Sequence, residues 1–179
     1  MTTKTYYERL LPYYRSCFDM EEPYDLCGME CLSHGYFYSH SEKYVLTREA
    51  RLWESNSFEH VFFIEKDVLE EADLEEMDRR IREYVEPVLV RKNEKYPEKD
   101  HMYTYVTFVF LCGSAPKKDV VKLFMKYSFT KNYLFTFRGF CQVRVVLADM
   151  ENEMIMTNRA GKALLKLYKK AMKQRDRLH

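Results

Sequence analysis

The run from Met102 to Cys112, MYTYVTFVFLC, constrains the fold of this chain more than any other part of its sequence. It is rich in β-branched and aromatic residues, which favour a strand. Its even and odd positions are equally fit for burial. A strand that is buried on both faces lies inside a sheet with cover on both sides. We therefore predict an α+β fold, in which helices cover a mixed sheet whose central strand is 102–112.

Shorter patterns place the remaining elements around this strand. Apolar residues at spacings of three and four predict helices, and runs rich in Val, Phe and Tyr predict strands. The predicted helices are 3–18, 69–86, 116–127 and 159–176. The other predicted strands are 31–39, 43–53, 58–65, 132–138, 141–149 and 153–157. One β-meander is thus expected before the central strand and another after it.

The connectors indicate how the strands pair, and the prolines indicate where helices bend or end. The short polar connectors 39–42 and 54–57 predict that the first three strands are antiparallel. Pro12 either kinks the first helix or opens a second short one, and Pro87 ends or bends the next helix. The length suits one domain, so we expect residues 1–179 to form a single globular unit.

The charge balance and the cysteines limit the compartment and the partners. Lys and Arg number 29 and Asp and Glu 28, so no overall field attracts the chain to nucleic acid or to a membrane. The longest apolar run is about half of the roughly 20 residues that a membrane-spanning helix needs. The first residues also lack the apolar stretch of a signal peptide. Five cysteines without a disulfide-framework spacing indicate reduced thiols, so we expect a cytoplasmic protein without membrane contact.

The familiar signatures of catalysis are missing from the sequence. It has no phosphate-binding glycine loop, no nucleophile elbow, no HExxH and no EF-hand pattern. With five glycines in total, a backbone cradle for a nucleotide is disfavoured, and we expect no cofactor. Four zinc-type ligands lie within 14 residues at a non-standard spacing, which favours ordinary thiols and surface histidines over a metal site. They are Cys27, Cys31, His34 and His40.

The last predicted helix carries a basic face. Its lysines recur every three or four residues and therefore stack on one side, opposite an apolar side that suits the core. We expect this face to be solvated, with contact to phosphates, nucleic acid or a membrane surface as alternatives. The acidic helix 69–86 is a candidate internal counterweight. The lysines are Lys162, Lys166, Lys169 and Lys173.

A further set of candidates lies on the late strands. Arg144 sits among apolar neighbours in strand 141–149, and a buried guanidinium is costly unless it is paired. An ion pair with Asp149 or with a helix carboxylate is the favoured explanation. If the protein binds an anion in a pocket, Arg144 is the first choice, because a guanidinium grips a carboxylate or phosphate with two hydrogen bonds. Arg138 and Asp149 complete this candidate ligand site.

The predicted order α-β-β-β-α-β over residues 3–112 resembles the core of the PD-(D/E)xK nuclease superfamily. The resemblance implies metal-binding acids on the second and third strands and a lysine that helps to activate water. Here Glu65 and Lys66 of SFEHVFFIEK are adjacent, so they point to opposite faces of a strand. The nearest spacing, Glu49 to Arg51, has arginine in the lysine position.

The chain also resembles an uncharacterised bacterial domain family in four segments that span most of its length: KTYYERLLPYYRSCF, SEKYVLTREARLW, FRGFCQVRVVLADM and TNRAGKALLKLY. This resemblance implies a compact bacterial cytoplasmic domain and no particular mechanism. We predict a non-catalytic binding or protein-interaction module, whose partner is an unknown protein or a small anionic ligand. The alternative is a metal-dependent or degenerate nuclease-like protein that binds nucleic acid. A homo-oligomer with an aromatic interface is the third hypothesis.

Overall fold

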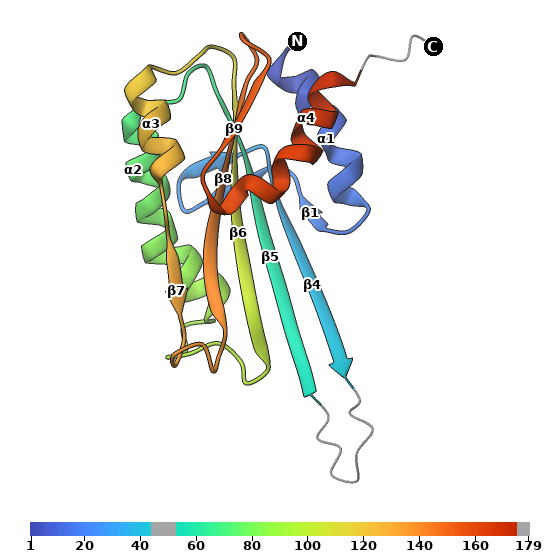
Figure 1. Cartoon of the computed structure of the whole chain (residues 1–179), viewed down its shortest axis with the longest axis vertical. Coiled ribbons are helices and arrows are strands. Elements are labelled where there is room, and N and C mark those ends of the chain that lie inside the picture. Colours follow the sequence, from blue (N-terminus) through green and yellow to red (C-terminus); the bar gives the residue numbers. More distant parts are fainter. Residues whose placement is uncertain (44–52, 175–179) are drawn as a thin grey trace.

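The computed structural model describes residues 1–43 and 53–174. It confirms the α+β class, with a mixed sheet and helices against both of its faces (Figure 1). The helices are α1 (Thr3–Arg15), α2 (Glu71–Arg80), the π-helix η1 (Ile81–Val90), α3 (Lys118–Lys126), the 3₁₀-helix η2 (Ala160–Leu164) and α4 (Leu165–Lys173). The strands are β1 (Asp19–Glu21), β2 (Tyr24–Leu26), β3 (Met29–Cys31), β4 (Ser33–Lys43), β5 (Trp53–Lys66), β6 (His101–Cys112), β7 (Thr130–Asn132), β8 (Phe140–Asp149) and β9 (Met154–Thr157).

The main sheet has a parallel centre and antiparallel margins. Its strand order is β1-β4-β5-β6-β8-β7, and β9 also pairs with β8. The strands β5, β6 and β8 run parallel, whereas β1, β4, β7 and β9 pair antiparallel with their neighbours. β2 and β3 form a separate hairpin.

The central strand is the one that the sequence predicts. β6 lies between β5 and β8 in the middle of the sheet. Val106, Phe108 and Phe110 are fully buried in one hydrophobic core, and Val109 and Leu111 are fully buried in a second one. Both faces of this part of β6 are therefore shut away from solvent.

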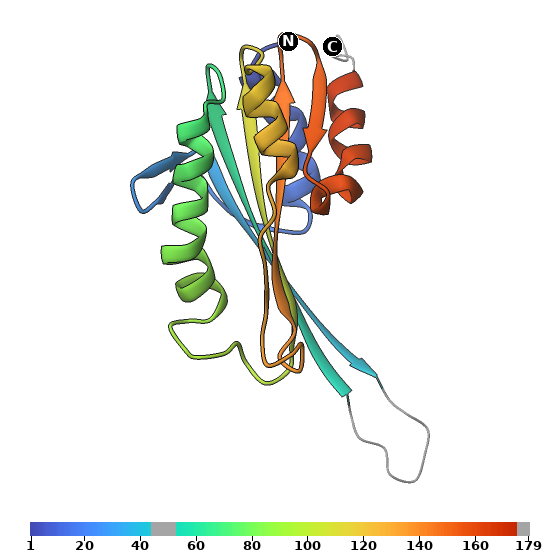
Figure 2. The same ribbon diagram turned by 60° about the vertical axis from the view of Figure 1, so that its left-hand side comes forward.

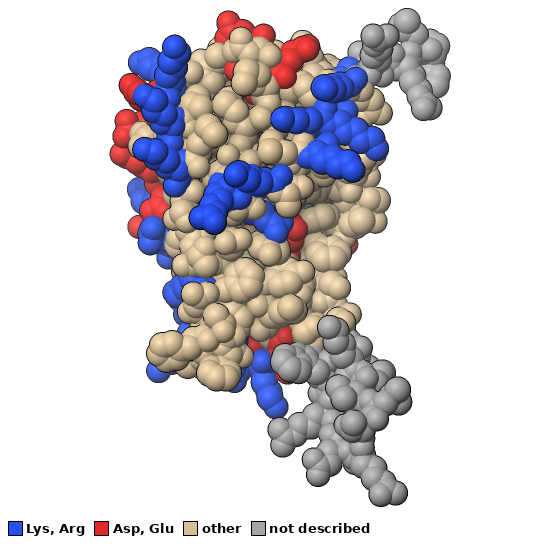
Figure 3. Space-filling model, viewed as in Figure 1, with Lys and Arg blue, Asp and Glu red and all other residues tan. Residues whose placement is uncertain are grey.

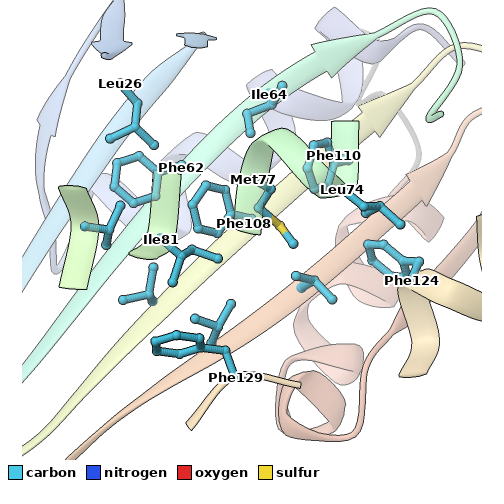
Figure 4. Packing of buried hydrophobic residues seen from close by; sticks show 14 of the residues in the cluster. Leu26, Phe62, Ile64, Leu74, Met77, Ile81, Phe108, Phe110, Phe124 and Phe129 are labelled. Carbon is cyan, nitrogen blue, oxygen red and sulfur yellow. The ribbon is translucent and has the colours of Figure 1, made fainter. Parts of the chain in front are cut away.

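The two cores lie on opposite faces of the sheet, and Figure 2 shows the sheet between their two layers of helices. The first core is covered by α2, η1, α3 and the β2–β3 hairpin. In Figure 4, Phe108 and Phe110 of β6 lie against Leu74, Met77 and Ile81. The second core is covered by α1 and α4, whose tyrosines pack on the other side of the same strands.

The sheet extends well beyond the helices α1 and α4. Figure 1 shows the lower parts of β4, β5, β6 and β8 continuing below both helices. We call this lower part of the three central strands the distal half of the sheet: residues 55–60, 101–107 and 140–144. On the face of the first core, η1 and the following segment 91–100 still accompany it (Figure 2).

The long strands β4 and β5 replace the start of the predicted first meander. They pair with each other along all of β4, so the predicted connectors 39–42 and 54–57 are wrong. Polar residues are tolerated in these stretches because the lower parts of β4 and β5, here called the hairpin arm, extend below the helices (Figure 1), where His40 and Ser41 are exposed. The predicted strand 43–53 falls mostly on residues 44–52, which lie outside the described residues.

The predicted strand 132–138 is also wrong. β7 ends at Asn132, and residues 134, 135 and 136 take left-handed backbone angles, with φ of 47°, 52° and 76°. They form a tight turn before β8. The aromatic residues that suggested a strand are not in a core, because Phe135 is 93% exposed and Phe137 is 86% exposed.

The second predicted helix begins later and runs further than expected. α2 starts at Glu71 and continues as η1 to Val90, so Pro87 does not end it. Proline has no N–H to donate and crowds the preceding turn of an α-helix, and the wider π winding accommodates it. Glu86, the last residue of the predicted helix, is thereby held inside η1 in a buried position above the sheet. Pro12, similarly, lies inside the single helix α1 rather than opening a second one.

Candidate functional site

A cavity of about 400 Å³ lies on the first-core face of the distal half of the sheet. This volume falls in the range of small-molecule sites. Its roof is the end of η1 and the segment 91–98, which the parallel connection from β5 to β6 carries over the sheet. Its floor comes from three strands and the turn before β8, through Tyr36, Phe58, His60, His101, Thr104 and Arg138.

The floor of the cavity is built from rings. Tyr36 lies 5.1 Å from His60 and 6.4 Å from Phe58, measured between ring centroids. Phe58 is stacked on His101 with 13° between the ring planes at 5.8 Å. Tyr36 and His60 are tilted at 40°, whereas Phe58 is nearly parallel to both Tyr36 and His101, so the floor offers an apolar surface of rings against which a flat molecule can pack.

Burial keeps the floor histidine His60 and its neighbour His34, which lies outside the cavity lining, neutral. Burial lowers the pKa of His34 to about 4. The pKa of His60 falls to about 3, mainly through burial and further through its neighbour His34. The two rings are nearly parallel, with 8° between their planes, and are joined edge to edge by a hydrogen bond of 3.0 Å between Nε2 of His34 and Nδ1 of His60. At neutral pH they are therefore uncharged hydrogen-bonding groups.

His101 is neutral for the same reason and has a defined tautomer. Its pKa is lowered chiefly by burial. Its Nδ1 lies 2.8 Å from the backbone carbonyl of Arg138, which can only accept, so Nδ1 carries the proton. Its Nε2 then accepts from the hydroxyl of Thr104 at 2.8 Å. Both ring nitrogens are engaged, which leaves the oxygen of Thr104 free to accept from a ligand.

Cations outnumber acids around the cavity. The charged lining residues are Arg91, Lys92, Lys95 and Arg138 against Glu94 and Glu98. Arg91 is neutralised by the buried Glu86, which its Nε contacts at 2.6 Å. Arg138 donates one hydrogen bond, of 3.3 Å, to the carbonyl of Pro97. The remaining N–H groups of Arg138 make it the best-placed cation for an anionic ligand.

Glu86 is a functional residue that the sequence pattern does not reveal. Its carboxylate accepts hydrogen bonds from Arg91, from Lys131 at 2.8 Å and from Tyr133 at 2.8 Å. Burial raises the pKa of Glu86, but these donors outweigh burial and hold it below its usual value. Glu86 thereby fixes Arg91 in the roof. A glutamate next to Pro87 in an apolar run is the one signal that marks it in the sequence.

The three predicted ligand residues do not form one site. Arg138 lines the cavity, whereas Arg144 lies on the opposite face of the sheet. Asp149 is at the other end of β8, roughly 30 Å along the strand from Phe140. There its carboxylate accepts from the backbone and the side chain of Asn152, at 3.1 and 2.8 Å.

The suggested pairing of Arg144 with Asp149 is wrong. Arg144 lies 3.8 Å from the carboxylate of Glu59 on β5, and its guanidinium stacks 3.2 Å from the ring centre of Tyr105. Glu59 in turn accepts a hydrogen bond of 3.0 Å from Thr107. The pKa of Glu59 is raised by burial, although Arg144 and Thr107 oppose the shift.

The lysine face of the last helix is exposed, as expected. Figure 3 shows basic side chains gathered over η2 and α4. α2 covers the other face of the sheet, so the proposed attraction between the acidic and the basic helix is absent. The exposed lysines are Lys162 of η2 and Lys166, Lys169 and Lys173 of α4.

The candidate zinc ligands are dispersed. Cys27 is exposed in the β2–β3 turn, and Cys31 is buried in the first core. His34 contacts His60, while His40 lies six residues further along β4 beside Asn56. Within residues 1–43 and 53–174, no group of three or more His, Cys, Asp or Glu side chains is placed to hold a metal ion.

The nuclease-type pairs are not assembled either. The side chain of Glu65 is exposed and accepts from Thr3, and Lys66 pairs with Asp73 of α2 at 2.7 Å. The other pair, Glu49 to Arg51, lies outside the described residues. Glu65 and Lys66 of β5 are thus engaged separately, by α1 on one face of the sheet and by α2 on the other.

A family model for a domain of unknown function, DUF8052, matches residues 2–170. The chain belongs to the DUF8052 family. This confirms the resemblance to an uncharacterised domain family across almost the whole chain. Comparisons of this DUF8052 domain with curated proteins and with solved structures gave no match. No helix in the described part of the chain is both long and apolar enough to pass through a membrane.

Proposed function

We propose that this protein is a single-domain, non-catalytic binding module of the cytoplasm, and that its cavity takes a small planar molecule with an anionic group. The observation that carries the proposal is the combination of a ring-lined floor with a cationic rim in a cavity of about 400 Å³. A flat apolar body suits the floor, and a carboxylate or phosphate suits Arg138.

The polar groups of the floor support binding rather than acid–base chemistry. His101 has both ring nitrogens engaged, and His34 and His60 are bonded to each other. Their lowered pKa values keep all three uncharged at neutral pH. A general base works best with a pKa near the working pH, whereas burial lowers the pKa of His34 to about 4 and that of His60 to about 3, and also lowers the pKa of His101. They can orient a ligand without exchanging protons with it.

The proposal is tested by isothermal titration with three probes of related shape. These are 2-naphthoate, its neutral analogue 2-naphthamide, and cyclohexanecarboxylate, which is anionic but not flat. We expect naphthoate to bind tightest, because it alone satisfies both the floor and the cation. Arg138→Gln should weaken naphthoate by about tenfold, the usual value of a charge-assisted hydrogen bond, and leave naphthamide nearly unchanged.

The matched control is Arg159→Gln, which removes an exposed arginine of the opposite face. It should leave the affinity for naphthoate unchanged. Equal affinity of the wild-type protein for all three probes would contradict the proposed selectivity. So would a loss of naphthoate binding that is the same for Arg138→Gln and Arg159→Gln, because that loss would report net charge rather than the cavity.

A further inference from the structure

The lower part of the other face of the distal half of the sheet is bare. At its upper margin Thr107 is fully buried and Glu59 and Arg144 are mostly buried, but below them Figure 3 shows a broad uncharged surface beyond the ends of α1 and α4. Three partly exposed rings lie on it in adjacent register positions of β6 and β8: Tyr103, Tyr105 and Phe140. Ring centroids are 4.7 Å apart between the two tyrosines and 6.0 Å from each tyrosine to Phe140. We call these three residues the aromatic patch.

Arg144 stands at the upper margin of the aromatic patch. Its guanidinium lies flat on Tyr105 and faces Glu59 at 3.8 Å, which is too long for a hydrogen bond. Its Nε is buried without a hydrogen-bond partner among the described residues. A buried donor that is left unpaired is costly, so such a group is well suited to a ligand that accepts from it.

A basic border adjoins Arg144. The start of η2 packs directly along β8, because Asn158 bonds the N–H of Val145 at 3.2 Å and the carbonyl of Val143 at 3.2 Å. From residue 154 to residue 174 the chain has six cations and no Asp or Glu. Figure 3 shows these basic side chains over η2 and α4, next to the uncharged surface. They are Arg159, Lys162, Lys166, Lys169, Lys170 and Lys173.

We propose that this face binds single-stranded nucleic acid. Unpaired bases stack on the aromatic patch, and the phosphates lie towards Arg144 and the basic border. Rings on an open sheet and a neighbouring row of cations are the two elements by which proteins hold single strands without reading a sequence. A duplex keeps the faces of its bases inside the stack, so it can use the cations and not the rings.

The charge of the basic border favours a nucleic acid over a second copy of the chain as the partner of this face. A two-fold pair through the bare face would place each patch against itself. With the two-fold axis directed from the aromatic patch to the basic border, the six cations of one border would face those of the other, and like charges across an interface are costly. A polyanion is instead complementary to the same border.

The test is fluorescence anisotropy with a labelled oligothymidylate and a matched oligouridylate of about twelve nucleotides, and with a blunt duplex of equal length. Single strands should bind more tightly than the duplex. Binding should weaken steeply between about 50 and 200 mM salt, because each phosphate contact releases a counterion. The double variant Tyr103→Ala/Phe140→Ala should weaken single-strand binding by roughly tenfold or more.

A second variant keeps the test valid if the aromatic one is poorly folded. Lys162→Glu/Lys166→Glu changes only exposed side chains. It should weaken single-strand binding and flatten its salt dependence by roughly one unit of slope. The control Arg79→Glu reverses an exposed charge on α2, which covers the other face. It should leave single-strand affinity within about twofold.

Three outcomes would overturn the proposal. One is the absence of salt-sensitive binding to either single strand. Another is binding that the duplex shares fully and that the aromatic variant does not weaken. The third is a sedimentation mass of twice 21.8 kDa that the aromatic variant halves, because the bare face would then belong to a second copy.

Discussion

The two faces of the distal half of the sheet are covered in opposite ways by the same strands. On one face η1 and the segment 91–98 enclose a cavity, and on the other the aromatic patch is open to solvent. This difference in cover arises because the helices are shorter than the strands. The 13 residues of α1 span about 20 Å, whereas the 12 residues of β6 span about 40 Å, so a single helix covers half a strand. Only the long connection from β5 to β6 reaches the rest.

The largest effect on both faces is expected at Gly139, where the turn before β8 lies against the backbone of β6 at His101 and Met102. Its φ is +70°, and an added Cβ would lie 2.1 Å from the carbonyl oxygen of Met102. Gly139→Ala should therefore cost about 3 kcal/mol or more and disturb both the cavity and the aromatic patch. Urea unfolding measures the loss.

Gly113→Ala is the matched control for this substitution. An added Cβ there meets only the carbonyl oxygen of Asp67 at 3.5 Å, an ordinary contact. Its cost should stay within about 1 kcal/mol. Equal costs at Gly113 and Gly139 would mean that the distal half does not depend on the close backbone approach at Met102.

The two faces also differ in their buried carboxylates. Glu86, behind the cavity roof, holds three donors, whereas Glu59, on the bare face, has Thr107 and a distant Arg144. Glu86→Gln should cost about 2 kcal/mol of the free energy of unfolding, because it removes the buried counter-charge of the partly exposed Arg91 and Lys131. Glu59→Gln should cost about 1 kcal/mol or less.

The stability contributed by Glu86 and the stability contributed by Glu59 should change in opposite directions as the pH falls. The pKa of Glu86 is lowered on folding, so its contribution is present above the unfolded pKa and is lost as the pH falls through the folded one. The pKa of Glu59 is raised, so the folded state takes up its proton first and gains stability as the pH falls. Urea midpoints at neutral pH and near pH 4 distinguish the cases, and the same sign for both carboxylates would contradict the assignment.

A smaller, pH-dependent change in the free energy of unfolding is expected from His60 of the cavity floor. His60 has a pKa of about 3 in the fold and an ordinary value of 6.5 when unfolded. The unfolded chain therefore binds the extra proton first, and stability falls as the pH drops from about 6.5 towards 4. Each such histidine contributes a slope of up to about 1.4 kcal/mol per pH unit.

His60→Phe should flatten that acid slope while costing about 1 kcal/mol at neutral pH, where one hydrogen bond to His34 is lost. The measurement is the urea midpoint across this pH range. Unchanged acid sensitivity in His60→Phe would show that the carboxylates alone set it. His40→Phe, on the exposed hairpin arm, serves as the comparison variant.

The sequence predicted those parts of the fold in which local pattern and burial agree. Residues 102–112 are buried on both faces in the middle of the sheet, and the expected helices at either end of the chain cover it. The pattern failed where burial is absent. His40 and Ser41 are polar and exposed although they belong to a strand, and Phe137 looks like a core residue but lies in an exposed turn.

The candidate site was predicted only in fragments, because it depends on pairs that are distant in sequence. Arg138 lines the cavity from the turn before β8, and the spacing of apolar residues does not predict this turn. The partner of Arg144 is Glu59, which lies two strands away in the sheet order. The roof exists because a π-helix carries the chain past Pro87, and sequence rules treat proline as an end.

The contact between α1 and α4 has a consequence for how the protein forms. The hydroxyl of Tyr6 donates to the backbone carbonyl of Tyr168 at 2.9 Å, and the hydroxyls of Tyr14 and Tyr168 lie 2.5 Å apart. A ribosome must therefore make residue 168 before the first helix meets its partner. Until then the hydroxyls of Tyr6 and Tyr14 lack these partners, and the last helix made is the one that closes the second core.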